Sequence, residues 1–164
     1  SEPTLTTERL ILRPLREDDA PAVFAWSSDI EASRLLPRAP HTHVGQTVAV
    51  LKRIRAQAEA GTAVGFVLTH RGDDTAIGIA GIHHIEREND SAQIAYQILR
   101  AHEGRGLMSE AIARIVEHSF RELKLHRIEA RIDPRNVRSL RLAERMRFSK
   151  EGLLREHFKF EERF

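Results

Sequence analysis

The sequence contains no cysteine and few aromatic residues. Among its 164 residues there are 7 phenylalanines, 1 tryptophan and 1 tyrosine. Without cysteine the chain has no disulfide framework, no thiolate ligand for zinc and no cysteine nucleophile. No metal site is expected, and the absence of cysteine fits a cytoplasmic protein.

Long apolar runs and a strong excess of either charge are missing as well. No run approaches the roughly 18 apolar residues that a membrane-spanning helix needs. The opening stretch "SEPTLTTERL" is polar, unlike a signal peptide, so no membrane partner is expected. The formal net charge of +2 does not indicate a dedicated nucleic-acid-binding protein.

What the sequence does contain is an ordinary globular composition, 41% hydrophobic and 30% charged. Its length predicts a single domain over residues 1–164. Three strands with short turns between them are expected at residues 63–70, 76–86 and 91–99, which favours an antiparallel meander. A further strand is predicted at residues 9–15.

The second half of the chain alternates between helix and strand patterns. A strand at residues 127–134 lies between two helices, and residues 149–160 are expected to form one more strand. Strand, helix and strand in succession imply a crossover and a parallel pair. The fold class is therefore mixed α/β, with a mostly antiparallel sheet of about six to seven strands. A first helix is predicted with Asp18 or Asp19 as its N-cap. Three further helices are predicted at residues 44–61, 107–124 and 136–148.

The stretch "HEGRGLMSEA" at residues 102–111 combines two glycines, an arginine and a helix start. A helix begins with unpaired N–H groups and a partial positive charge, and glycines let a ligand approach the backbone. This predicts an anion site for a phosphate group, with Arg105 adding charge. Ser109 stands where a dinucleotide-binding loop would have its third glycine. The alternative is a flexible turn before an ordinary helix.

Five stretches in order resemble one family, the GNAT superfamily of acyl-CoA-dependent N-acetyltransferases. Within it, the similarity is to the Rim-type branch of ribosomal-protein N-terminal acetyltransferases. The resemblance implies the GNAT fold, in which two parallel strands splay apart to hold acetyl-CoA. The stretches are "TERLILRPLREDD", "AQIAYQI", "EGRGLMSEA", "IDPRNVRSLRLAERMRF" and "SKEGLLREH", and together they span nearly the whole chain.

The resemblance also implies where acetyl-CoA binds. Its pantetheine arm would pair with the open strand edge at Ile98 and Leu99, and Asn136 would reach that arm near the thioester. The alternative role of Asn136 is to cap the following helix. The pyrophosphate would lie on the loop formed by Gly104, Arg105, Gly106, Leu107, Met108 and Ser109.

The implied reaction is direct attack of a primary amine on the thioester, the amine being a protein N-terminus or a small molecule. Many members use a tyrosine as proton donor, but this chain has Ala143 at that position. The Rim-type branch has a serine three residues after the asparagine, which is Ser139 here, so the resemblance implies Ser139 as the proton donor to the thiolate. The alternative is that Ser139 only makes a local backbone bond. The base candidates are Glu86 and His84. Strand alternation places these two on one face and His83 on the other, and the alternative is a solvated strand end.

Several positions depart from the family pattern. Gln93 replaces a glutamate, Arg147 replaces the glycine at a helix end, and Glu103 brings a carboxylate near the pyrophosphate loop. The chain also stops where relatives continue into a closing strand. An open edge there would favour a homodimer. The acceptor cleft would be built by residues 24–45 and by strand ends.

Two other function classes remain open from the sequence. One is a non-catalytic acyl-CoA-binding or protein-interaction module on the same fold, because fold does not fix function. The other is nucleic-acid binding by the arginines of the last predicted helix. Three of these, Arg138, Arg141 and Arg145, share a helical face, which is either a solvated surface or a site for the 3′-phosphate of CoA.

Overall fold

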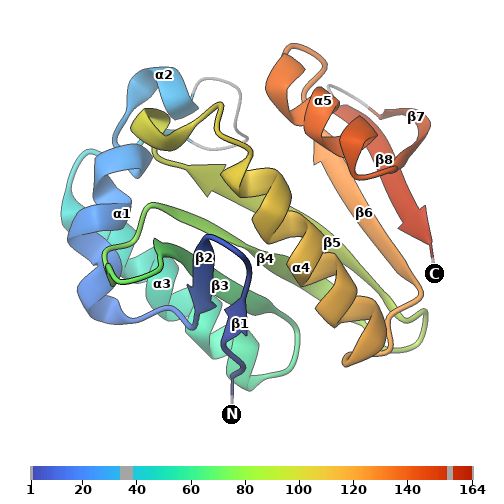
Figure 1. The fold of residues 1–164 in the computed structure, drawn as a ribbon, viewed down its shortest axis with the longest axis horizontal. Coiled ribbons are helices and arrows are strands. Elements are labelled where there is room, and N and C mark those ends of the chain that lie inside the picture. The colour runs from blue at the N-terminus through green and yellow to red at the C-terminus, as the bar shows by residue number, and fades with distance from the viewer. Residues whose placement is uncertain (1, 34–38, 155–156, 164) are drawn as a thin grey trace.

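A computed structural model describes residues 2–33, 39–154 and 157–163, and in it the chain forms one 8-stranded sheet (Figure 1). The strand order is β1-β2-β3-β4-β5-β6-β8-β7. The strands are β1 (Leu5–Thr6), β2 (Leu10–Arg13), β3 (Val64–His70), β4 (Gly78–Glu86), β5 (Ser91–Ile98), β6 (Arg127–Ile132), β7 (Ser149–Leu154) and β8 (His157–Arg163).

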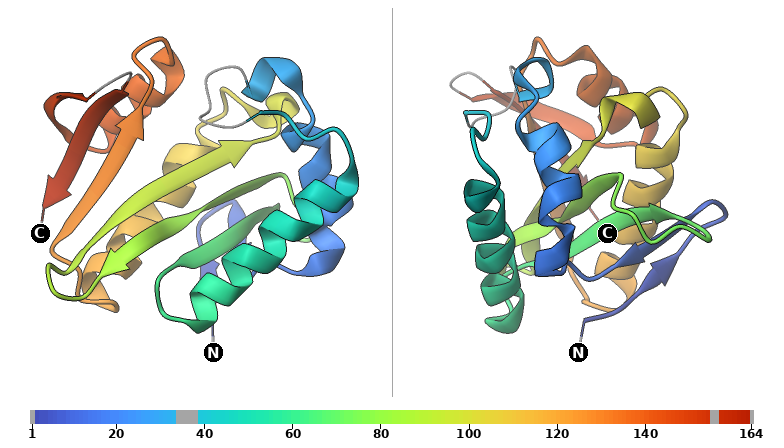
Figure 2. Two further views of the ribbon diagram at one scale, coloured as in Figure 1. Left: turned by 180° about the vertical axis from the view of Figure 1, so that it is seen from behind. Right: turned by 90° about the vertical axis from the view of Figure 1, so that its left-hand side faces the viewer.

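Helices cover both faces of the sheet. The two views of Figure 2 show α4 and α5 on one face and α1 and α3 on the other. The α-helices are α1 (Ala20–Ser27), α2 (Ile30–Ser33), α3 (Val44–Glu59), α4 (Leu107–Arg121) and α5 (Val137–Arg145), and Glu17–Asp19 and Arg100–His102 form 3-10 turns. The mixed α/β class and the mostly antiparallel sheet are confirmed, with more strands than expected.

The apolar spacing of the sequence explains how α4 packs. Its apolar residues recur at helical spacing and form a stripe that faces the sheet. Leu107, Ala111, Ile112 and Ile115 are buried in the larger core cluster together with strand residues such as Phe66. A smaller cluster on the opposite face joins α1 and α3 to the sheet. The sheet is thus held rigidly from both sides.

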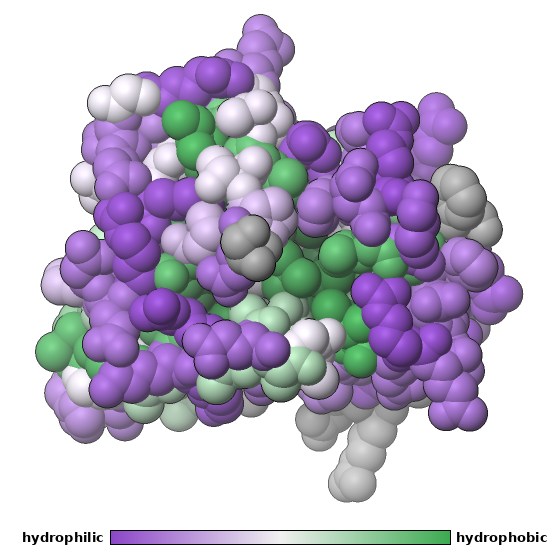
Figure 3. Space-filling model, turned by 90° about the horizontal axis from the view of Figure 1, so that it is seen from below, coloured by the Kyte–Doolittle hydropathy of each residue, from purple (hydrophilic) through white to green (hydrophobic). Residues whose placement is uncertain are grey.

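Charged side chains surround the apolar interior. Seen from one end, the surface is hydrophilic around most of its border, with hydrophobic residues grouped in the middle (Figure 3). Within the described residues, no helix is both long enough and apolar enough to cross a bilayer.

Among the described strands one pair is parallel, β5 with β6, and this pair shapes the site. The two strands pair only from Ser91 to Gln93 on β5 and from Arg127 to Glu129 on β6. Figure 1 shows them diverging beyond that point. The remainder of β5 keeps its antiparallel partner β4 along one edge, as in the pairing of Ile98 with Gly78. Its other edge is therefore open, as the predicted splayed pair requires.

The C-terminal segment differs from the prediction. Residues 149–160 were expected to give one strand, yet β7 and β8 are separate antiparallel strands, with residues 155–156 outside the described part. Strand β8 lies between β6 and β7. The expectation that the sheet lacks a closing strand is therefore wrong. The reason given for a homodimer, an edge left open by that missing strand, no longer holds.

The exit of α5 shows how the chain manages without the expected glycine. Arg147 adopts φ 63°, the left-handed conformation that glycine prefers. Its N–H donates to the Glu144 carbonyl at 3.0 Å, and the Phe148 N–H donates to the Ala143 carbonyl at 2.9 Å. The helix end is thus capped normally, at the cost of strain in a residue with a Cβ atom.

Candidate active site

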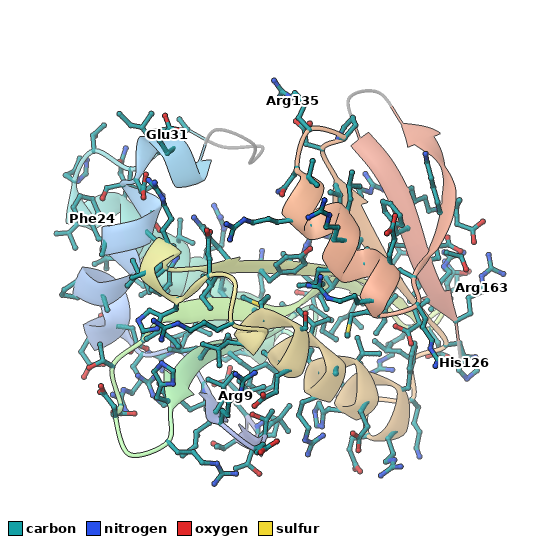
Figure 4. All side chains as sticks on the ribbon, turned by 45° about the horizontal axis from the view of Figure 1, so that its top comes forward. Arg9, Phe24, Glu31, His126, Arg135 and Arg163 are labelled. Atoms are coloured by element: carbon teal, nitrogen blue, oxygen red, sulfur yellow. The ribbon has the colours of Figure 1, made fainter. Side chains whose placement is uncertain are left out.

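A cavity of about 830 Å³, here called the splay cleft, lies where β5 and β6 diverge. Figure 4 shows Glu31 on α2 and Arg135 just before α5 on opposite sides of this end of the sheet. The wall of the splay cleft is formed by Glu31, Tyr96, Gln97, Ile98, Arg100, His102, Glu103, Gly104, Gly106, Leu107, Met108, Ser109, Asn136, Arg138, Ser139, Arg141, Leu142 and Arg145.

The glycine-rich loop enters this wall in the left-handed conformation. Gly104 has φ 77° and Gly106 has φ 74°, and Gly106 is the N-cap residue of α4. A Cβ on Gly104 would meet no atom within 4 Å, so the requirement for glycine is conformational rather than spatial. The loop delivers the N-terminus of α4 to the cleft, where unpaired N–H groups and the helix dipole favour an anion.

Arginines give the splay cleft an excess of positive charge. Of its lining residues Arg100, Arg138, Arg141 and Arg145 are cationic, whereas Glu31 and Glu103 are acidic. Glu103 forms an ion pair with Arg138 at 2.9 Å, so its charge is compensated from α5. Arg145 donates to the Ser109 hydroxyl at 3.1 Å. Three arginines of α5 therefore face a cleft that suits phosphate groups, not only solvent.

The loop is braced from behind by Arg9 on the N-terminal hairpin. The Arg9 guanidinium donates to the Arg105 carbonyl at 2.9 Å and pairs with Glu110 at 2.7 Å. Arg105, predicted to contact the cofactor, does not line the splay cleft. Its carbonyl instead anchors the loop. No sequence pattern indicates this contact, because Arg9 and Arg105 are far apart in the chain.

The open edge of β5 is shifted from the predicted position. Leu99 does not line the cleft, because its N–H already donates to the Ile77 carbonyl at 2.8 Å and its side chain packs in the smaller core cluster. Strand backbone groups alternate in direction, so those of Tyr96 and Ile98 point toward the open side. Of the predicted cofactor residues, those lining the cleft are Ile98, Gly104, Gly106, Leu107, Met108, Ser109, Asn136 and Ser139.

Asn136 and Ser139 meet at the N-terminus of α5. The Asn136 side-chain oxygen accepts a hydrogen bond from the Ser139 N–H at 3.2 Å, so the predicted helix cap forms. Because capping uses the oxygen, any further bond into the cleft must come from the amide hydrogens of Asn136. Both side chains border the splay cleft.

Tyr96, the only tyrosine of the chain, was not among the predicted site residues. Its hydroxyl oxygen is buried and forms no hydrogen bond of normal geometry within the described residues. Burial raises the pKa of Tyr96, an effect opposed by the nearby Ser139 hydroxyl and by Arg145. Strand alternation, which places Tyr96 on the face of Ile98, was the signal that would have revealed it.

A second cavity of about 610 Å³, here called the rear cavity, lies on the other face of β5. Tyr96 and Gln97 line both cavities, so the two meet at this point of the strand. The other walls of the rear cavity come from α1, α3, β3 and β4, and include Trp26, Leu51 and Gly81. Of residues 24–45, expected to build the acceptor cleft, Trp26, Ser27 and His41 line this cavity, and residues 34–38 lie outside the described part.

The two histidines of β4 lie side by side, which corrects the predicted alternation. His84 has φ 51°, and the pairing of β4 with β5 shifts register between His83 and Glu86. The bulge brings the two imidazole rings to a centroid distance of 4.6 Å, and both line the rear cavity. Burial, the neighbouring His84 and Arg131 lower the pKa of His83.

Glu86, the other predicted base, lies apart from both cavities. It lines neither of them, and its carboxylate accepts a hydrogen bond from the Asn89 side chain at 3.0 Å. The bulge at His84 also means that His84 and Glu86 no longer follow a regular alternation. His84 therefore lines the rear cavity, whereas Glu86 ends strand β4 and lines neither cavity.

Comparison with known proteins gives consistent results. Residues 9–149 match the model of a family described as the acetyltransferase (GNAT) domain. The N-acetyltransferase p20 of Bacillus licheniformis is 36% identical over 95% of this chain and 88% of its own length. The ribosomal protein uS5-alanine N-acetyltransferase of Escherichia coli is 30% identical over 93% of this chain and 81% of its own.

Solved structures are similar over almost the full chain. An acetyltransferase from Agrobacterium tumefaciens has a TM-score of 0.86 at 26% identity and covers 100% of this chain and 96% of its own. RimJ of Mycobacterium smegmatis, in complex with CoA-disulfide, has a TM-score of 0.82 at 27% identity, over 98% of this chain and 86% of its own.

Proposed function

The chain belongs to the acetyltransferase (GNAT) family, and from that premise we propose that it transfers the acetyl group of acetyl-CoA to a primary amine. The amine is a protein N-terminus or part of a small molecule. The observation that carries the proposal is the meeting of the splay cleft with the rear cavity at Tyr96 and Gln97. A cofactor on one face of β5 and an acceptor on the other would meet there.

Acetyl-CoA supplies the activated acetyl group when bound, and the splay cleft has the chemistry to hold it. Gly104, Gly106 and the first turn of α4 offer N–H groups to the pyrophosphate. The arginines of α5 that line the cleft offer cations to the remaining phosphate. The amide hydrogens of Asn136 and the open edge of β5 at Ile98 serve the pantetheine arm.

The histidine pair is proposed to take the proton of the amine. A protonated amine has no free electron pair, so a base must deprotonate it before it attacks. His83 and His84 line the rear cavity, and the lowered pKa of His83 keeps its imidazole neutral and able to accept a proton near neutral pH. Gln93, where relatives carry glutamate, cannot act as a base.

Ser139 is proposed to protonate the departing thiolate. Its side chain borders the splay cleft next to Tyr96. The raised pKa of Tyr96 keeps its phenol protonated, so that it can donate toward Ser139. With acetyl-CoA in the splay cleft, these two neighbouring hydroxyl groups would supply the proton that the departing thiolate takes up.

Titration calorimetry with acetyl-CoA tests the cofactor site. Gly106→Trp should abolish micromolar binding, because the indole would occupy the loop. Gly72→Trp is a matched control, since Gly72 has φ 85° and open space around it, in a turn that lines neither cavity. Both variants carry similar backbone strain. Equal loss of binding in both variants, or no binding by the folded parent, would contradict the proposal.

Release of free CoA in the presence of amines separates the enzyme from a non-catalytic module on the same fold. Transfer to at least one primary amine is expected. Binding of acetyl-CoA without transfer to any acceptor would favour the acyl-CoA-binding module instead.

A further inference from the structure

The rear cavity has a mainly apolar wall. Aliphatic and aromatic side chains from both helices and the sheet line it, among them Val23, Trp26, Val50, Leu51, Ile54 and Ile82. Leu51 and Trp26 are almost fully buried there, with exposed fractions of 0% and 1%. Its volume of about 610 Å³ is in the range of small-molecule sites.

The groups of this wall that can carry a charge near neutral pH are basic. Among the described lining residues they are Arg53, His41, His83 and His84, no carboxylate is among them, and the phenol of Tyr96 stays neutral because burial raises its pKa. Arg131, near enough to lower the pKa of His83, adds another positive charge. A second ammonium group entering the cavity would lose water without gaining a counter-ion, which is strongly unfavourable.

Three acidic residues on the surrounding elements, Asp29, Glu31 and Glu86, do not line the rear cavity. Asp29 forms an ion pair with Arg100 at 3.2 Å. Glu31 borders the splay cleft, and Glu86 lines neither cavity. The described wall of the rear cavity thus suits an acceptor with one amino group, which the histidine pair can deprotonate. The rest of the acceptor molecule would be apolar and would contact the apolar side chains of the wall.

We propose that the acceptor is a monoamine whose amino group is attached to an uncharged apolar group, and that the rear cavity excludes polyamines. This inference rests on the proposed acetyl transfer. The apolar group would pack against Trp26, Leu51 and Ile54, while the amine lies between the histidine pair and the junction at Tyr96. A free arylalkylamine and a peptide with an apolar first residue share this chemistry.

Steady-state acetyl transfer to three probes tests the acceptor class. The probes are 2-phenylethylamine, a neutral peptide beginning with phenylalanine, and spermidine. Because an apolar group in a matching pocket gives a preference of about 10- to 200-fold, kcat/KM for at least one apolar probe should exceed that for spermidine about tenfold or more. Comparing the first two probes tells whether the source is a free amine or a chain terminus.

Binding is measured independently of turnover through Trp26. It is the only tryptophan of the chain and belongs to the wall of the rear cavity. Titration of the protein alone with the preferred apolar amine should change the tryptophan fluorescence saturably, whereas spermidine should not. This readout needs no acetyl-CoA.

A substitution that fills the rear cavity with a larger side chain tests the same site by mutation. Ala95 lines the rear cavity from the exposed part of β5, so Ala95→Phe should raise the acceptor KM about tenfold and leave acetyl-CoA affinity unchanged. Ala56→Phe is the control, because Ala56 is exposed on α3 and lines neither cavity.

Two outcomes would overturn the inference, for different reasons. Spermidine acetylated as well as or better than the apolar probes, with acetyl-CoA bound normally, would refute the acceptor class and leave the proposed function standing. Failure of the folded protein to bind acetyl-CoA would refute the proposed function, and the acceptor class with it.

Discussion

Tyr96 illustrates how a single residue can be placed for function rather than for stability. Its hydroxyl oxygen is buried and makes no hydrogen bond of normal geometry within the described residues, so its burial costs about 1 kcal/mol of stability. Evolution could have avoided this cost with phenylalanine. The position of the hydroxyl beside Ser139, at the junction of the two cavities, gives a reason to keep it.

Tyr96→Phe should therefore separate stability from activity. We expect the variant to unfold at the same or a higher temperature, because it removes an unpaired polar group, and to gain about 1 kcal/mol. Its kcat for acetyl transfer should fall about tenfold or more, because the phenol no longer supports Ser139. Thermal unfolding and steady-state kinetics test both parts, and an unchanged kcat would remove Tyr96 from the mechanism.

Arg147 is a second residue that carries strain, here at a position with no role in either cavity. Arg147→Gly should raise the free energy of unfolding by about 1 kcal/mol, because glycine adopts the left-handed conformation without a Cβ penalty. Glu144→Gly serves as the control, because Glu144 lies within α5. Glycine at that position should lower the free energy of unfolding by about 1 kcal/mol. Chemical denaturation measures both, and destabilisation by Arg147→Gly would contradict this account.

The residues that sequence reasoning misplaced are those that depend on local backbone geometry. The face of His84 could not be foreseen, because a bulge with a positive φ has no glycine to mark it. Leu99 was off by one position along an alternating strand, which reverses the direction of its N–H group. By contrast, the glycine turn at Gly104 and Gly106 and the helix cap at Asn136 formed as predicted, because glycine in a turn and asparagine at a helix start have direct conformational causes.

At the scale of elements, the splay cleft depends on a hairpin remote from it in sequence. The loop before α4 is held by the contacts of Arg9 with Arg105 and Glu110. These contacts fix the direction in which the N-terminus of α4 points. By holding the loop in one conformation, Arg9 would raise the affinity for acetyl-CoA without contacting the ligand, because less conformational freedom is lost on binding.

Arg9→Ala should weaken acetyl-CoA binding about three- to tenfold, because the loop must then be ordered on binding. Calorimetric titration measures the change. Arg16→Ala is a suitable control, since Arg16 forms exposed ion pairs with Asp18 and Asp74 far from the loop and has a similar side-chain exposure of 49%, against 46% for Arg9. Equal weakening in both variants would contradict the bracing role.

Elements with strong periodicity were the ones that could be predicted. The stripes of α3 and α4 gave helices that begin at the expected residues, Val44 and Leu107. The division into β7 and β8 was missed because residues 154–157 contain no glycine, proline, asparagine or aspartate to signal a turn. Very short elements such as β1 and α2 have too few residues to show a period.

At the scale of the whole molecule, the described strands form two parts of the sheet that are joined at the paired residues of β5 and β6. Closing strand β8 holds the C-terminal part together, and Glu161 lies at its centre. Its carboxylate is bound by Lys159 at 3.0 Å and by Arg163 at 2.8 Å, with a side-chain exposure of 2%. Burial alone would raise the pKa of Glu161, but these two partners outweigh it and lower the pKa.

This arrangement predicts how acid affects the fold. Because the pKa of Glu161 is lowered on folding, its ionised form stabilises the protein above the ordinary glutamate pKa of about 4.3, and that stability is lost as pH falls through the lowered value. Glu161→Gln should cost roughly 2 kcal/mol at neutral pH and flatten the loss of stability in the acid range.

The neighbouring Glu162 provides a control of opposite sign. Burial raises the pKa of Glu162, so its ionised form disfavours folding and its protonation on acidification favours it. Glu162→Gln should therefore be neutral or stabilising near pH 7 and should steepen the loss of stability in acid, since the compensating protonation is gone. Urea unfolding of both variants across the acid range measures the two slopes. If both variants changed the slope in the same direction, the opposite pKa shifts of Glu161 and Glu162 would not be the cause of the acid dependence.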